Sequence, residues 1–319
     1  MNNNEFNFID IDDPAEAEER LIMTRRLAEY GAEALRVGSQ VESLYVTYSE
    51  FKAALAACDR IFNLSKILET PQGMIITGPP GSAKTSLAQY FIASLPPSDL
   101  FETGFGAIFL RLRVAPTQGH IISALLHALK YPFTQIRRGR TYAMRDISFE
   151  ALRQRGTKVV FVDQGHCLAT QARPRHSDVL ESGASDTLRE MMEETGVGLI
   201  LLADASFGGL QHVDRALDDR ITVRMEFTHF SDGNEWKGFL NAFVKGIPAI
   251  DLSILNAPEV ATLTHTATNG NRRSFRRLIV ETAMLATESK ASAVQVEHLR
   301  KAFDAVNGNA PGRTNPYAA

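Results

Sequence analysis

Cysteine is nearly absent from this sequence, since Cys58 and Cys167 are the only two in 319 residues. Two thiols cannot supply a disulfide framework or a cysteine-rich zinc site, so both of these classes are excluded. So low a cysteine content suits a reducing compartment. We therefore expect the protein to work in the cytoplasm.

Long apolar runs are also missing. No stretch approaches the roughly 18 to 20 apolar residues of a membrane-spanning helix, so no membrane contact is expected. The N-terminus carries seven acidic residues before its first basic one, Arg20, which is the reverse of a secretory signal or a transit peptide. With 44% hydrophobic residues the chain can bury a sizeable core, so fibrous and wholly disordered classes are excluded.

Neither sign of charge is in large excess, because the net charge is −3. The charges are unevenly spread, however, and residues 111–158 hold ten lysines and arginines against two acidic residues. Such a segment indicates a basic face that follows a phosphate backbone. A solvated helix face with ion pairs explains the same count, so charge alone leaves both interpretations open.

The spacing of apolar residues predicts the order of helices and strands. Two N-terminal helices are expected, one over residues 14–37 after the cap residue Asp13 and one over residues 49–64. Five short apolar runs then alternate with helical stretches, at residues 74–77, 107–114, 158–163, 199–203 and 221–227. This alternation predicts an α/β fold with a parallel five-stranded sheet. Beyond Phe230 only helical periodicity remains, at residues 236–244, 258–266, 274–289 and 294–306.

A glycine-rich loop joins the first expected strand to a helix. In such a loop the backbone N–H groups and the helix N-terminus hold phosphates, Lys84 reaches the β- and γ-phosphates, and Thr85 ligates Mg²⁺. Ala83 stands where the strict pattern has glycine. A Pro-Gly turn before a helix is the plainer alternative, but Lys-Thr at this offset favours a site for ATP and Mg²⁺. The expected site residues are Gly78, Pro79, Pro80, Gly81, Ser82, Ala83, Lys84, Thr85 and Ser86.

An acidic residue ends the expected strand at 158–163. We expect this strand to lie beside the strand at 74–77 and to aim Asp163 at the Mg²⁺. P-loop ATPases of this type usually place glutamate next, to activate the attacking water, and this chain has Gln164. An amide holds a water but cannot accept its proton as a carboxylate does, so slow or absent hydrolysis is predicted. His166 or an acid among residues 190–194 remains an alternative base.

Four motifs follow one another along the chain. They are Thr47-Tyr48-Ser49-Glu50-Phe51, the loop from Gly78 to Thr85, Asp163-Gln164-Gly165-His166 and Gly270-Asn271-Arg272-Arg273. The strand order, the P-loop, Asp163 and the helical C-terminal part with its arginine-rich start together resemble the AAA+ ATPases. Within that class the order of the four motifs looks like that of the bacterial transposition regulators of the TnsC/TniB type, which are relatives of the target-selection ATPases MuB and IstB. The resemblance covers roughly residues 45–300.

The resemblance implies further nucleotide-site residues. Asp204 occupies the sensor 1 position, with Ser206 as the alternative. Arg220, or failing that Arg215, takes the place of an arginine finger that reaches a neighbouring subunit's nucleotide. A structural arginine paired with Asp218 or Asp219 is the competing interpretation of Arg220. Arg273 best fits sensor 2, which reads the γ-phosphate.

The same resemblance implies partners. ATP would drive the subunits into a filament or ring around duplex DNA, with contacts to phosphates rather than to bases. A transposase and a target-selection protein would then bind the assembly. The expected DNA contacts are Arg137, Arg138, Arg140, Thr117 and Lys130.

The domain organisation follows from these assignments. We expect an N-terminal helical extension at residues 1–47, a P-loop AAA+ domain at 48–229, a small helical lid at 230–306 and a flexible tail at 307–319. The predicted function is an ATP-dependent regulator of transposition in a bacterial cytoplasm. Two alternatives stay open: an AAA+ ATPase of another DNA process, such as a helicase-loader-like or remodelling protein, and a nucleotide-locked scaffold that does not hydrolyse ATP.

Overall fold

A computed structural model gives the fold. It describes residues 30–68, 70–97, 99, 106–136, 139–169, 183–308 and 314–318. The chain forms two compact units. One consists of Tyr45–Phe239 with Thr268–Ser274, and the other of the N-terminal segment to Leu44 with Leu240–Ala267 and Phe275–Ala319.

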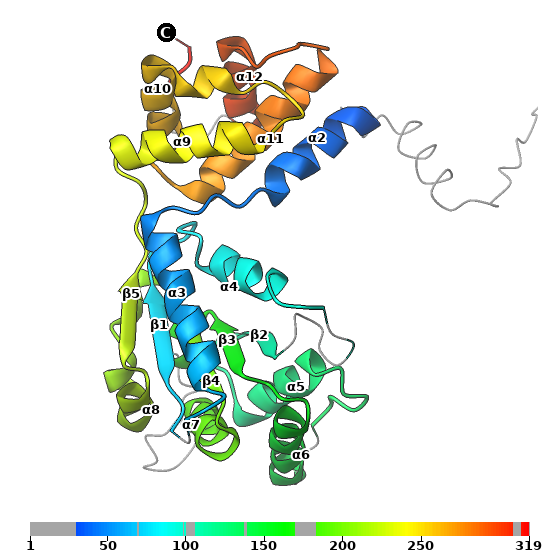
Figure 1. The fold of residues 1–319 in the computed structure, drawn as a ribbon, viewed down its shortest axis with the longest axis vertical. Coiled ribbons are helices and arrows are strands. Elements are labelled where there is room, and N and C mark those ends of the chain that lie inside the picture. The colour runs from blue at the N-terminus through cyan, green and yellow to red at the C-terminus, as the bar shows by residue number, and fades with distance from the viewer. Residues whose placement is uncertain are drawn as a thin grey trace, which may run out of the picture. The chain divides into compact units, whose positions relative to one another are not determined.

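The first unit is built on a parallel five-stranded sheet, as the sequence predicts (Figure 1). Its strand order is β2-β3-β4-β1-β5. Each strand overlaps a run that the sequence predicts, and its ends fall within three residues of the predicted ends. The strands are β1 (Gly73–Thr77), β2 (Ala107–Arg111), β3 (Val159–Asp163), β4 (Gly198–Leu202) and β5 (Val223–Glu226).

The expected neighbour of the P-loop strand is wrong. Strand β3 does not pair with β1, because β4 lies between them and pairs in parallel with both. All five residues of β3 and of β4 are buried, so both strands read as continuous apolar runs and carry no signal for their order. The carboxyl ends of these parallel strands still share one edge of the sheet. Asp163 therefore reaches the loop that follows β1 across the end of β4.

Helices cover both faces of the sheet. Val160 and Val162 of β3 belong to a buried cluster with α5 (Gln118–Ala128), α6 (Thr141–Gln154) and α7 (Gly183–Thr195). Phe161 between them points to the other face, as alternation along a strand requires. Its ring centroid lies 5.4 Å from that of Phe91 on α4 (Lys84–Ala93). On that face α4 packs against α3 (Ser49–Leu64), whose bounds match the predicted helix.

Short elements connect β3, β4 and β5 in the same unit. They are η1 (Gly165–Ala169), η2 (Ala205–Phe207), η3 (Leu210–His212) and α8 (Arg215–Arg220). Asp214 caps α8 by accepting a hydrogen bond from the N–H of Leu217 at 2.9 Å. These elements place the residues that follow β3 and β4 near the sheet edge that carries the P-loop.

The second unit is helical. It contains α2 (Ala32–Ser43), η4 (Ser253–Asn256), α12 (Val296–Asn307), most of α10 (Pro258–Thr268), and the later residues of α9 (Asn234–Gly246) and α11 (Arg272–Glu288). Phe243 of α9 and Phe275 of α11 meet edge to face, with ring centroids 5.0 Å apart. The four C-terminal helices cover the predicted ranges. Residues 32–43, which the sequence assigns to a separate extension, group with these helices.

The predicted helix over residues 14–37 is confirmed only from Ala32 onward, and its predicted end is wrong. Residues 14–29 lie outside the described residues, and helix α2 begins only at Ala32, after Gly31 in an extended conformation. The N–H of Gly31 donates to Oε2 of Glu288 at 2.8 Å instead of joining a helix. The helix then continues to Ser43, beyond the predicted end.

Part of the predicted flexible tail is packed. Tyr317 is 3% exposed, and its hydroxyl donates to Oγ1 of Thr264 at 3.0 Å. Burial raises the pKa of Tyr317 to about 12. Nδ2 of Asn315 donates to the carbonyl of Arg300 and to Oδ1 of Asp304 on α12. Tyr317 and Asn315 thus anchor residues 314–318 in a stretch whose composition suggests mobility.

In the described part of the chain, no helix is long and apolar enough to cross a membrane.

Candidate nucleotide site

The loop between β1 and α4 has the backbone geometry of a phosphate loop. Gly81 and Ala83 both adopt positive φ angles, of 82° and 72°. A Cβ at Gly81 would lie 2.2 Å from Oδ1 of Asn271, so only glycine fits there. Nζ of Lys84 donates to the carbonyls of Gly78 at 2.7 Å and Pro79 at 3.0 Å. The lysine is therefore held over the loop, at the N-terminus of α4.

Charges around Lys84 come from three other predicted site residues. Burial lowers the pKa of Lys84 below its ordinary value. The carboxylates of Asp204 and Asp163 raise it, and the guanidinium of Arg273 lowers it again. All four residues belong to the first unit, so one compact body brings them together.

Ala83 carries the strain of its left-handed conformation. We expect Ala83→Gly to raise the free energy of unfolding by about 1 kcal/mol, because a side chain in this region costs about that much. Urea unfolding of both proteins measures the difference. Ala56→Gly, at an exposed position within α3, should instead lower stability by about 1 kcal/mol. Equal losses in both variants would contradict the assignment of strain to Ala83.

Asp163 lies beside Thr85, as the sequence predicts for a shared cation. The Thr85 hydroxyl donates to Oδ2 of Asp163 at 3.1 Å. Arg111 approaches the same oxygen at 3.4 Å, and the N–H of Gln164 donates to Oδ1 at 2.9 Å. A hydroxyl and a carboxylate are the oxygen ligands that Mg²⁺ prefers next to phosphates. The residues therefore fit Mg²⁺, held by Thr85 and Asp163.

Gln164 follows β3 with a φ of 60°. This left-handed turn ends the strand, and the Gln164 N–H is satisfied by the preceding carboxylate. The side chain is half-buried at the sheet edge. The backbone thus fixes position 164. The side chain at this position is an amide, whereas a catalytic base here would need a carboxylate.

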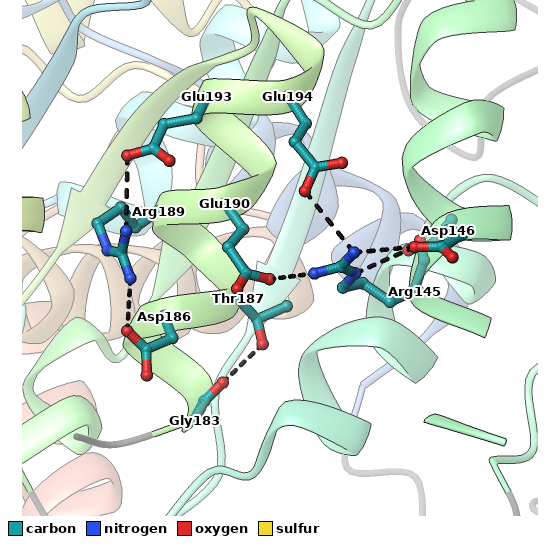
Figure 2. A network of polar contacts seen from close by, with 10 residues as sticks. Arg145, Asp146, Gly183, Asp186, Thr187, Arg189, Glu190, Glu193 and Glu194 are labelled. Carbon is teal, nitrogen blue, oxygen red and sulfur yellow. Dashed lines mark hydrogen bonds and ion pairs between the residues drawn. The ribbon is translucent and has the colours of Figure 1, made fainter. Parts of the chain in front are cut away.

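The alternative bases are already engaged in other contacts. Nδ1 of His166 accepts the N–H of Asp204 at 3.3 Å. Figure 2 shows the acidic residues of α7: Glu190 and Glu194 both pair with Arg145, at 2.7 and 3.7 Å. Glu193 pairs with Arg189 at 3.6 Å. These contacts favour none of them as a replacement for a glutamate at position 164.

Asp204 closes the other side of the site. Its carboxylate caps η2 by accepting hydrogen bonds from the N–H and the hydroxyl of Ser206, at 3.0 and 2.9 Å. These hydrogen bonds lower the pKa of Asp204, and the charge of Lys84 adds to the effect. The predicted sensor 1 residue and its alternative thus form one hydrogen-bonded pair beside Lys84.

The two candidate arginine fingers lie at opposite ends of α8. Arg215 is exposed at its start. Arg220, at its end, forms an ion pair with Glu193 of α7 and donates to the carbonyl of Ala216. Asp218, one partner considered from the sequence, pairs with Arg224 instead, at 2.7 Å.

Sequence reasoning gave no role in the site to Asn271, just before α11, or to Arg272, the first residue of that helix. Arg273, the predicted sensor 2 residue, is exposed. Its neighbour Arg272 is buried and donates to the Ser82 carbonyl at 3.1 Å. Nδ2 of Asn271 donates to the Pro80 carbonyl at 3.0 Å. Tyr48 and Glu50, which lie beside Arg272 in the fold, are plain in the sequence, but nothing in the sequence links them to position 272.

The basic segment divides into two groups. Arg111, Arg145 and Arg153 form ion pairs within the chain, as the plainer interpretation of this segment holds. Lys130 and Arg140 are exposed at the two ends of the loop between α5 and α6. Thr117 caps α5 by accepting the N–H of His120 at 3.3 Å. Arg137 and Arg138 lie outside the described residues.

Comparison with known proteins decides the family. The model of the bacterial TniB protein family matches residues 36–227. The chain belongs to the TniB family. That match spans the later part of α2, the whole sheet and the P-loop, so the predicted relationship to TniB-type ATPases is confirmed. A search of the curated proteins finds no match for this TniB-family chain.

Solved structures similar to this TniB-family chain show its fold. The Aeropyrum pernix ORC2 protein, solved as ADPNP-ADP complexes, has a TM-score of 0.60 at 16% identity, covering 83% of this chain and 71% of that chain. The Aeropyrum pernix ORC1 protein in complex with DNA has a TM-score of 0.56 at 17% identity, with coverage of 82% and 66%. Drosophila ORC bound to DNA has a TM-score of 0.54 at 14% identity, with coverage of 93% and 75%. The predicted α/β AAA+ fold is confirmed.

Proposed function

We propose that this TniB-family protein binds ATP with Mg²⁺ and that ATP drives its copies to assemble on duplex DNA. The observation that carries the proposal is the P-loop, whose Lys84 and Thr85 meet the strand-end carboxylate of Asp163. The nucleotide complexes of the similar ORC2 protein support the same ligand class.

Each site residue has a role in this proposal. The N–H groups of the P-loop and the Lys84 ammonium bind the phosphates, and Thr85 and Asp163 hold the Mg²⁺, which neutralises phosphate charge. Gln164 orients a water through its amide without taking its proton. Arg273 reads the γ-phosphate, and Arg220 of one subunit reaches the nucleotide of the next.

Duplex DNA is the proposed polymer partner. Lys130 and Arg140 are exposed, and two similar proteins, ORC1 and Drosophila ORC, were solved with DNA. Contacts to phosphates make binding independent of base sequence. The filament or ring would present the DNA to a transposase and a target-selection protein, in the bacterial cytoplasm that the TniB family implies.

A second candidate function follows from Gln164. With an amide at the catalytic position, bound ATP would act as a structural link between subunits without being turned over. A third candidate is an AAA+ ATPase of another DNA process, such as a helicase loader, which the likeness to ORC proteins supports. Coverage of duplex DNA without strand separation would favour the transposition regulator over the helicase loader.

The DNA proposal predicts the effect of reversing charge. The double variant Lys130→Glu with Arg140→Glu should bind unrelated duplexes equally weakly in the presence of ATP. The slope of log affinity against log salt should fall by about 2, because each lost phosphate contact removes about 0.9. Fluorescence anisotropy over a salt series measures both quantities.

A matched control separates specific contacts from net charge. Lys52→Glu changes an exposed lysine on α3 and should leave the salt slope unchanged. An unchanged salt slope in the double variant would show that the DNA contacts lie in another part of the protein.

A further inference from the structure

The first residue of α11, Arg272, is a buried arginine of the first unit. Arg272 is 9% exposed. Its guanidinium carbon lies 4.1 Å from the ring centroid of Tyr48 and 4.2 Å from that of Phe230. Burial lowers the pKa of Arg272 below its ordinary value, so the charge is held there against a desolvation penalty. A charge kept at such a position needs a purpose beyond packing.

The contacts of Arg272 connect three segments of the first unit. Nη1 donates to the carbonyls of Ser82 at 3.1 Å and Thr228 at 2.7 Å. Nη2 lies 3.5 Å from Oε2 of Glu50, at the start of α3. The planar guanidinium, with its donors in a fixed fork, therefore ties the P-loop to the segment after β5 and to α3.

A second P-loop carbonyl is held in the same way. Nδ2 of Asn271 donates to the Pro80 carbonyl at 3.0 Å, and Nε2 of His229 lies 3.2 Å from the same oxygen. Oδ1 of Asn271 accepts the N–H groups of Arg273 and Ser274, which caps α11. We call His229, Asn271 and Arg272 the carbonyl clamp.

Gly270 allows the carbonyl clamp to lie close to the P-loop. A Cβ at Gly270 would lie 1.9 Å from the carbonyl oxygen of Phe230. The Gly270 carbonyl accepts the N–H of Phe230 at 3.1 Å. This close backbone contact brings residues 271 and 272 against the P-loop, on the side that its carbonyls face.

Holding these carbonyls fixes the N–H groups on the other side of the loop. In a planar trans peptide the C=O and the N–H point in opposite directions, and the described residues contain no cis peptide. With the Pro80 and Ser82 carbonyls turned toward the clamp, the N–H groups of Gly81 and Ala83 point away from it. Among the described residues none accepts a hydrogen bond from either group. Both donors are therefore available to a phosphate.

We propose that the carbonyl clamp is a positioning device that presets the Gly81 and Ala83 N–H donors of the P-loop for phosphate before nucleotide binds. This inference rests on the proposed nucleotide site and adds residues that do not touch the ligand. Donors oriented in advance need no reorganisation on binding. The clamp therefore acts on every ligand with a diphosphate, whereas Arg273 acts on the γ-phosphate.

The experiment compares ligands as well as variants. Kd values for ATP, ADP and inorganic pyrophosphate are measured by calorimetry on the full chain. Asn271→Asp keeps the oxygen that caps α11 but removes the donor to Pro80, and Arg272→Met keeps the apolar stem between the two rings. Each variant should raise the Kd of all three ligands by a similar factor of about 10, which corresponds to about 1.4 kcal/mol of binding free energy.

Three further variants separate positioning from general damage. Arg272→Lys, which restores one donor, should recover part of the loss. Arg277→Met, at an exposed position on the same helix, should bind all three ligands normally. Arg273→Met should weaken ATP but not ADP or pyrophosphate. If Arg272→Met does not fold, Asn271→Asp alone decides. In the nucleotide-free protein this variant should change the NMR chemical shift of the Gly81 amide.

Two outcomes overturn the inference. One is a normal Kd for pyrophosphate and ADP in folded Asn271→Asp and Arg272→Met. The other is a loss confined to ATP, which would make the clamp a γ-phosphate reader. If the unaltered protein binds neither ATP nor ADP, the proposed nucleotide site itself fails, so the two failures are distinguishable.

Discussion

A Gln164→Glu variant is expected to hydrolyse ATP about 100-fold faster than the unaltered protein, because a carboxylate accepts the proton of the attacking water and an amide does not. The backbone at this position is already set by a φ of 60° and by the hydrogen bond from the Gln164 N–H to Asp163. The substitution therefore changes the chemical group without moving it. Steady-state phosphate release, with and without duplex DNA, measures the effect.

The control for this variant carries the same change of charge elsewhere. Gln40→Glu, at an exposed position on α2, should leave the ATPase rate unchanged. Fast hydrolysis by the unaltered protein when DNA is added would show that another residue supplies the base. In that case His166 and the acids of α7 become the candidates again, despite the contacts that engage them here.

A Lys84→Ala variant is expected to lose ATP affinity on the order of 100-fold, and with it ATP-dependent assembly. An ammonium bound to phosphate oxygens contributes about 1.5 to 3 kcal/mol, which is about 10- to 100-fold in Kd. The same change removes the bonds from Nζ to the carbonyls of Gly78 and Pro79. Calorimetry gives the Kd, and light scattering gives the particle size with and without ATP.

Lys52→Ala is the matched control, because it removes an exposed lysine from α3 in the same unit. It should leave both measurements unchanged. Assemblies of normal size formed by Lys84→Ala without bound nucleotide would refute the view that ATP controls assembly. Thermal unfolding of each variant shows whether a loss comes from the site or from the fold.

The sequence predicts local features of this site well. The P-loop and the strand that ends at Asp163 each depend on a few neighbouring residues, so spacing and residue type are enough to find them. The order of the strands depends instead on pairing between distant segments. Strands β3 and β4 are both buried throughout, and nothing within either run says which one pairs with β1.

The same distinction explains why Arg272 escaped sequence reasoning. Four arginines lie within six residues at the start of α11, and they look alike in the sequence. Only the tertiary fold surrounds Arg272 with the rings of Tyr48 and Phe230, which come from segments about 180 residues apart. Its neighbour Arg273 is exposed to solvent, so its side chain can contact a bound ligand.

The position of β4 between β1 and β3 also sets the order of events during synthesis. Within the part of the chain that the structure describes, strand β1 pairs only with β4 and β5, and about 120 residues separate the end of β1 from the start of β4. At about 5 to 20 residues per second, the ribosome needs about 6 to 24 seconds to make them. Throughout that time the apolar strand that leads into the P-loop has no partner. The P-loop therefore follows a paired strand only after the chain has been made through β4.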